Sequence, residues 1–319
     1  MTLGPQSHAA RPTDLVALVT FDNEVRENQA VTLESLGADE HRSRPLNVAL
    51  AQWLHLGRRM WVNVDGREVH GIATARDLGA RSAWVIDTLI DAGSAGHGDE
   101  VIADLLAQAV EAARRAGVTH LLLRTATDAS AREPAMQAGF RPALPERLWT
   151  GSLSALPPAP GVTIRDATSA DQQALFQLYS RSAPAEARSM LAMTLDEWQA
   201  LRERRWSRGG GELLAEVNGR PVATLTFSEA QGRLQFELTA EPDADAAVRT
   251  LLGAMQENVG ETEALTLVPR HAGSIEQVLL AQGFQPDREY VLQAHRLRQP
   301  VKLESKVPVG VPVPSGGGA

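Results

Sequence analysis

The chain has 319 residues, 43% of them hydrophobic, which is enough for two domains with buried cores. Its net charge of −8 excludes a general surface for nucleic acid or anionic membranes, and no apolar run reaches membrane-spanning length or forms a signal-peptide core. The absence of cysteine excludes disulfides, a thiol nucleophile and cysteine zinc sites, so we expect a cytoplasmic protein.

The first half of the chain begins with predicted helices and continues with a hairpin. Apolar residues over 14–24 are compatible with a helix, and the polar stretch 28–45 is interpreted as a short helix with loops. Residues 60–75 are predicted to form a β-hairpin, because Asp65-Gly66 is suited to a tight turn with positive φ.

A strand, a glycine loop and a helix follow in direct succession. The apolar run 84–90 predicts a buried strand, and the apolar face over 101–113 predicts an amphipathic helix. Gly93, Gly96 and Gly98 lie between them. Glycines let backbone N–H groups approach a phosphate closely, and the helix N-terminus adds partial positive charge. The loop is therefore either a pyrophosphate site or a flexible turn that contains three glycines.

Residues 151–161 separate two halves of similar pattern. This segment is rich in Gly, Ser and Pro, which is typical of a linker. Beyond it we expect helices, a hairpin around Asn218-Gly219, a strand over 233–239 and further helix–strand units. The Pro-, Val- and Gly-rich residues 299–319 are predicted to form a disordered tail.

The two halves share sequence motifs. VNVDGREVHGIATA, which starts at residue 62, matches AEVNGRPVATLTF, which starts at residue 215. AMQAGFRPALPERLW, from residue 135, matches LLAQGFQPDREYVLQ, from residue 279. A period this long indicates two tandem copies of one domain, over 1–150 and 162–298, because solenoid repeats are much shorter.

The order of elements and the AGF and QGF endings resemble the GNAT superfamily of N-acyltransferases, in the tandem arrangement of mycothiol synthase-like proteins. The resemblance covers about 14–298. It implies an α/β (α+β) fold with two GNAT-like domains, each a mixed, mostly antiparallel sheet flanked by helices. It also implies acetyl-CoA as the co-substrate, bound at its pyrophosphate by an Arg/Gln-x-x-Gly-x-Gly/Ala loop. An Asn and a Tyr near the following helix often assist, the Tyr as general acid.

In the first copy, the resemblance places the cofactor on Gly93, Gly96, His97 and Gly98, with Gly93 where Arg or Gln is usual. The spacing from the following Leu-Leu pair favours a second register, at 97–102, about one helical turn later. We prefer the glycine register. Ala135 stands at the position of the Tyr, and Asp128 at that of the Asn.

The second copy departs further from the family pattern. Its loop, 241–248, contains no glycine, and three carboxylates stand where a pyrophosphate would lie. Like charges there should repel the ligand. Leu279 stands at the position of the Tyr. The second copy is therefore predicted to be a GNAT scaffold without its cofactor loop.

Asp87 and Asp91 are the candidate catalytic residues. Direct acyl transfer needs a deprotonated amine, and a carboxylate on or just after the central strand can take that proton. The alternative for each is a carboxylate paired with a cation or facing solvent. Glu237 is the similar residue in the second copy. The histidines show no paired metal spacing, so no metal site is expected.

Two functions follow from these residues. The first is an N-acyltransferase that transfers an acetyl group from acetyl-CoA to an amine of a small molecule or peptide, with the active copy N-terminal. The second is a non-catalytic GNAT-like protein that senses a ligand or binds a partner. The three glycines favour the first, and the missing Arg/Gln, Tyr and second loop favour the second. The sequence indicates no oligomeric state.

Overall fold

The computed structural model describes residues 6–14, 17–18, 26–36, 42–43, 58–65, 68–91, 98–202, 210–230 and 233–297. The predicted glycine loop, from Gly93 to His97, and the predicted tail, 299–319, lie outside these residues. Within them, the two halves repeat one order of elements, as the sequence motifs predict.

The first half contains β1 (Gln6–Ala9), η1 (Pro12–Asp14), β2 (Arg26–Glu27), η2 (Leu33–Ser35), β3 (Arg42–Ser43), β4 (Arg58–Asp65), β5 (Glu68–Asp77), β6 (Ala83–Asp91), α3 (Gly98–Arg115), β7 (His120–Ala126), α4 (Arg132–Gln137) and β8 (Arg141–Ser152). The second half contains β9 (Val162–Asp166), η3 (Ser169–Asp171), α5 (Gln172–Ser182), α6 (Ala185–Met190), α7 (Leu195–Leu201), β10 (Gly211–Val217), β11 (Arg220–Ala230), β12 (Arg233–Ala240), α8 (Asp245–Val259), β13 (Glu263–Pro269), α9 (Gly273–Ala281) and β14 (Gln285–Arg296).

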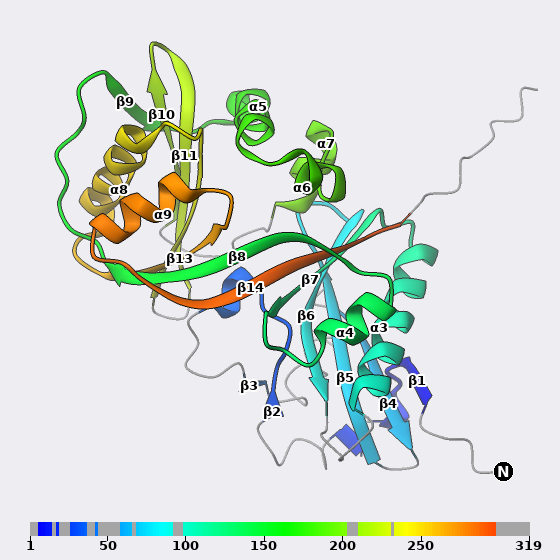
Figure 1. Ribbon diagram of the computed structural model, residues 1–319. Helices are drawn as coiled ribbons and strands as arrows, with labels where there is room; N and C mark the ends of the chain where they lie inside the picture. Colours follow the sequence, from blue (N-terminus) through cyan, green and yellow to red (C-terminus); the bar gives the residue numbers. More distant parts are fainter. Residues whose placement is uncertain are drawn as a thin grey trace, which may run out of the picture.

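One mixed sheet of twelve strands runs through both halves (Figure 1), in the order β1-β4-β5-β6-β7-β14-β8-β13-β12-β11-β10-β9. Among the described strands of this sheet, neighbours are antiparallel except in the pairs β6–β7 and β12–β13. Helices flank the sheet. The predicted fold class, α/β with a mixed and mostly antiparallel sheet, is confirmed.

The two halves exchange their last strands. β14 belongs to the second half by sequence but lies between β7 and β8, and β8 of the first half pairs with β13. Both strands are long and cross from one half to the other (Figure 1). The halves are therefore joined by a continuous hydrogen-bonded ladder in addition to the segment 151–161, whose first two residues already belong to β8.

The shared Gly-Phe pairs end α4 and α9 in the same way. Gly139 and Gly283 have φ of 93° and 84°, a conformation that glycine adopts without steric cost. Phe140 and Phe284 then enter the core, where they are 0% and 1% exposed. The motif repeats because each copy needs the same sharp exit from its last helix.

The apolar face predicted over 101–113 is the face that α3 buries against the sheet. Its buried residues are Val101, Ile102, Leu105, Leu106, Ala109, Val110 and Ala113. The corresponding helix α8 covers the second half of the sheet, with Val248, Leu251 and Leu252 at the centre of that core. Across the described part of the chain, no helix combines the length and the apolar character needed to cross a bilayer.

Candidate functional site

Asp87, a predicted catalytic residue, lies buried in the first half of the sheet. Its carboxylate accepts a hydrogen bond from Thr74 Oγ1 at 2.6 Å and pairs with Arg58 Nε at 2.9 Å. Arg76 Nε lies 3.9 Å away. This environment corresponds to the alternative stated for Asp87, a carboxylate that neutralises neighbouring cations and stabilises the sheet.

Asp91 and Gly98 lie together at the start of α3. A Cβ atom at Gly98 would lie 2.1 Å from Asp91 Oδ2, so a larger residue at this position would displace the Asp91 carboxylate. The helix therefore has a protein carboxylate beside its N-terminus, where negative charge is favourable. Gly93, Gly96 and His97 lie outside the described residues, so their predicted role stays a prediction.

The gap between β6 and β7 in the first half is occupied by the chain itself. These parallel strands pair from Ala83–His120 to Val85–Leu122. Beyond that point, Leu89 N donates to Asn28 Oδ1 at 2.7 Å, and Leu89 O accepts from Gln29 N at 2.9 Å.

The same segment also reaches the facing strand. Val31 N donates to Arg124 O on β7 at 2.8 Å. Residues 28–31 thus act as an inserted piece of backbone between β6 and β7. They use the backbone groups of Leu89 that an extended ligand would otherwise bind.

The equivalent gap in the second half is lined by cavities. β12 and β13 pair at Leu234–Ala264 and Gln235–Leu265 and then diverge. A cavity of 680 Å³ borders the diverging strands at Glu237–Thr239 and Leu267, and one of 210 Å³ continues along Leu238–Ala240. Tyr179, Leu144 and Pro269 line both cavities, so the two are adjacent.

The larger cavity, called the central pocket below, is built by both halves. The second half supplies α5, α7 and the strands β10 to β12, whereas the first supplies Val85, Leu122 and Leu144. Gly79, in the turn after β5, packs so closely on α7 that an added Cβ would lie 2.2 Å from Gln199 O. The pocket therefore depends on contact between the halves.

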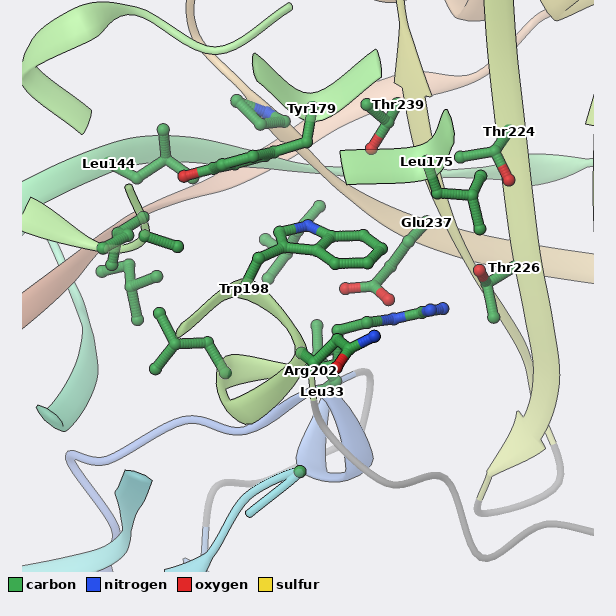
Figure 2. Close-up of a pocket in the computed structure, with 18 of the residues that line it drawn as sticks. Leu33, Leu144, Leu175, Tyr179, Trp198, Arg202, Thr224, Thr226, Glu237 and Thr239 are labelled. Carbon is green, nitrogen blue, oxygen red and sulfur yellow. The ribbon is translucent and has the colours of Figure 1, made fainter. Parts of the chain in front are cut away.

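Aromatic side chains form one wall of the central pocket (Figure 2). Trp198 of α7 lies with its ring centroid 6.4 Å from that of Tyr179 and 6.2 Å from that of Phe176, both on α5. Thr194 caps the start of α7, since its Oγ1 accepts from Glu197 N at 3.3 Å. Burial raises the pKa of Tyr179 to about 12, so its hydroxyl stays protonated at neutral pH.

The charged residues of the pocket include two ion pairs. Arg124 Nε donates to Glu146 Oε2 at 2.6 Å, with both side chains buried, and Arg202 Nη2 donates to Glu212 Oε1 at 2.7 Å. Arg202 also lies over the Trp198 ring, 5.0 Å from its centroid. Glu237 projects from β12 into the pocket beside Trp198 and Arg202 (Figure 2). These five are the charged side chains among the described residues that line the pocket.

A third cavity, of 740 Å³, lies at the start of α8. It is lined by the loop 241–244 and by Arg181 and Arg220, which both pair with Glu241, at 2.5 and 2.8 Å. Ala244 stands at the N-cap of α8, and its side chain does not cap the first backbone amides of the helix. Of the carboxylates predicted to repel a pyrophosphate, Glu241 is thus paired with two arginines, and Asp243 also lines the cavity.

Sequence reasoning named Glu237 only as the counterpart of Asp87 and Asp91 and favoured a non-catalytic carboxylate there, and it missed the aromatic wall and the pairing of Glu241. Trp198 and Tyr179 occur within helical patterns, where an aromatic residue is usually assigned to the core. Arg181 and Arg220 are 60 and 21 residues away from Glu241 along the chain, so no local spacing connects them. The described residues contain no cluster of His, Asp and Glu that could hold a metal ion.

The structure is similar to solved N-acetyltransferases. A GCN5-related N-acetyltransferase from Sphaerobacter thermophilus matches with a TM-score of 0.53 at 17% identity, over 94% of this chain and 98% of that one. A tandem GNAT protein from the clavulanic acid biosynthesis pathway matches with a TM-score of 0.51 at 15% identity, over 92% and 98%. No family model and no curated protein sequence matches the chain. At these identities the likeness establishes the fold.

Proposed function

We propose that this chain, which has the tandem GNAT fold, is an N-acyltransferase that transfers an acetyl group from acetyl-CoA to an amine. The observation that carries the proposal is the run of cavities along β12, from the central pocket to the start of α8. We assign the active site to the second half, because residues 28–31 occupy the corresponding gap in the first.

The three cavities match the chemical parts of the co-substrate. The cavity at α8 offers helix N-H groups and two arginines to a pyrophosphate. The gap beside Leu238–Ala240 is lined by apolar residues and by a strand edge, which suits the extended arm with its amide groups. The central pocket would then hold the thioester and the acceptor amine.

Two side chains of the pocket have the properties that the transfer needs. Glu237 is the candidate general base, which takes a proton from the ammonium form of the acceptor. The amine nitrogen then attacks the thioester carbonyl, the C–N bond forms, the C–S bond breaks, and the nitrogen releases its second proton to water. Tyr179, protonated at neutral pH and present where the two cavities meet, is the candidate acid that gives a proton to the leaving thiolate.

Blocking the gap between β12 and β13 should weaken the binding of the co-substrate. Thr239 is half-buried and lines both the central pocket and its continuation, so Thr239→Trp would fill the passage without replacing a core side chain. We expect acetyl-CoA to bind roughly tenfold or more weakly, as an overfilled site costs about 1–3 kcal/mol. Isothermal titration calorimetry measures this directly.

Gly96→Val is the matched variant in the first half. It replaces a glycine of the loop that sequence reasoning assigned to the pyrophosphate, and we expect it to leave acetyl-CoA binding within twofold of the unchanged protein. Loss of binding in Gly96→Val with retention in Thr239→Trp would return the site to the first half. Undetectable binding by the unchanged protein would favour the non-catalytic alternative.

Neutralising Glu241 should strengthen binding of the co-substrate. Glu241→Gln leaves Arg181 and Arg220 in place and removes the carboxylate that pairs with both. Both arginines are partly exposed, so we expect a gain of roughly threefold to tenfold in the affinity for acetyl-CoA, reduced at high salt. Titrations at two salt concentrations measure it, and Glu216→Gln, on β10, is the control. An unchanged or weaker affinity would show that these arginines do not face the ligand.

A further inference from the structure

An ion pair joins α7, the helix that carries Trp198, to the exchanged strand β14. Arg296 Nη2 donates to Glu197 Oε1 at 2.5 Å, and neither of these two residues lines the central pocket. Resting on the proposed function, we propose that Glu197 and Arg296 are positioning residues. Their pair anchors α7 on the first half of the sheet and so holds Trp198, the residue after Glu197, in place for the reaction.

Glu197 binds the start of α7 and Arg296 at the same time. Its Oε2 accepts from Met193 N at 2.9 Å, and its own N–H donates to Thr194 Oγ1 at 3.3 Å. Partial burial acts to raise the pKa of Glu197, but the hydrogen bond from Met193 N and the charge of Arg296 outweigh it and lower the pKa. The carboxylate is therefore ionised at neutral pH, and each of its oxygens accepts from one of these partners.

Arg296 joins two helices to the first half of the sheet. Its Nη1 donates to Ser189 O in α6 at 2.7 Å while its Nη2 binds the carboxylate of α7, so one planar guanidinium fixes both helices. Its backbone lies opposite His120 of β7, and Leu297 N donates to Thr119 O at 2.8 Å. The strand exchange thus places this arginine of the second half against a strand of the first.

A second attachment of α7 to the first half follows Trp198. Ala80 N, in the turn after β5, donates to Ala200 O at 3.3 Å. Trp198 therefore lies between two attachments, the carboxylate of Glu197 on one side and the carbonyl of Ala200 on the other. Its indole extends into the pocket near Tyr179 (Figure 2). Since a misplacement of about 1 Å can lower a rate roughly 100-fold, the attachment of this helix bears on the reaction.

A purely structural role for the pair predicts a different result from a positioning role. The side chains of Arg296 and Glu197 are 42% and 23% exposed, and exposed ion pairs contribute little to stability. Arg296→Gln should therefore lower the melting temperature by less than about 4 °C. Arg165→Gln is the matched control, because Arg165 is 41% exposed and pairs with Asp171 at 2.7 Å on the edge strand β9.

The test observes Trp198 directly by fluorine NMR. The full-length protein is labelled with fluorotryptophan, and the resonance of Trp198 is identified by its loss in Trp198→Phe. We expect Arg296→Gln to shift or broaden this resonance and to leave those of Trp61 and Trp149, which are buried in other parts of the core, in place. Arg296→Lys keeps the positive charge and should restore most of the original signal, which a change in stability alone does not predict.

Acetyl-CoA then relates the anchor to the proposed site. Saturating acetyl-CoA should shift the Trp198 resonance of the unchanged protein, because the proposed function places the thioester in the central pocket. In Arg296→Gln this response should fall by roughly twofold or more, while the dissociation constant of acetyl-CoA, measured by calorimetry, stays within about twofold. An equal response in the two proteins would show that the pair does not act on the site.

The comparison of the ligand-free proteins is decisive for the anchor. If the Trp198 resonance of Arg296→Gln coincides with that of the unchanged protein, or if Arg165→Gln displaces it equally, the pair does not position Trp198. Absence of acetyl-CoA binding by the unchanged protein contradicts the proposed function instead, and leaves this comparison as the test of the anchor.

Discussion

Glu237→Gln should reduce kcat for acetyl transfer by about 10²–10⁴-fold, the usual contribution of a general base. The amide has nearly the same shape as the carboxylate but does not accept the proton of the attacking ammonium. Glu237 lies on the wall of the central pocket, where β12 has begun to diverge from β13. Steady-state rates with an acceptor amine, together with the dissociation constant of acetyl-CoA, separate loss of chemistry from loss of binding.

The same variant has a second signature. Alkyl ammonium groups lose their proton in solution near pH 10, so the free amine becomes abundant without help from the protein. The loss of kcat in Glu237→Gln, relative to the unchanged protein, should therefore become smaller as the assay pH rises from 7 to 10. Glu263→Gln, an exposed position on β13 outside the pocket, is the control. If kcat falls by less than about threefold, or if the loss of kcat does not depend on pH, Glu237 is not the general base.

Local sequence patterns predicted most of the fold. The Asn218-Gly219 turn has the expected positive φ angles of 53° and 74°, and the apolar face of α3 is buried as its spacing indicates. The Gly-Phe pairs ended both predicted helices because a left-handed glycine and a buried phenylalanine are local requirements. These features depend on neighbours within a few residues.

The strand exchange could not be predicted from the sequence. β8 and β14 have equivalent positions in the two copies, so their patterns do not tell which copy each one joins. The insertion of residues 28–31 was also missed, since the polar stretch 28–45 was interpreted as a short helix with loops. In the structure its described part holds extended residues, a 3-10 turn over Leu33–Ser35 and the short strand β3. Asn28 acts there through contacts with Asp87 and Leu89, about 60 residues away.

These two features together explain why we propose the site in the second half, whereas the sequence motifs placed it in the first. The glycines of the first copy are a local signal, and local signals decided the sequence assignment. A binding cleft depends instead on what occupies the space between two strands, and that is set by long-range contacts. Leu36 extends the same segment to the second half, where its carbonyl accepts from Gln235 Nε2 at 3.1 Å.

Arg124→Met should lower the free energy of unfolding by about 3–5 kcal/mol, the usual cost of breaking a buried ion pair. Arg124 and Glu146 are 6% and 5% exposed, and removal of the guanidinium leaves the Glu146 carboxylate buried without its closest cation. The loss can be measured by urea denaturation. Arg124→Met combined with Glu146→Leu should recover most of the stability, since apolar side chains of similar size replace the pair.

The position of this pair makes the result informative about the whole chain. Arg124 lies on β7 and Glu146 on β8, and β14 of the second half runs between these strands, with Leu292 opposite Arg124 and Tyr290 opposite Glu146. Because the halves share this ladder, we expect a single calorimetric transition that shifts as a unit in Arg124→Met. Two transitions, of which only one shifts, would mean that the halves unfold independently and that the exchanged strands do not couple them.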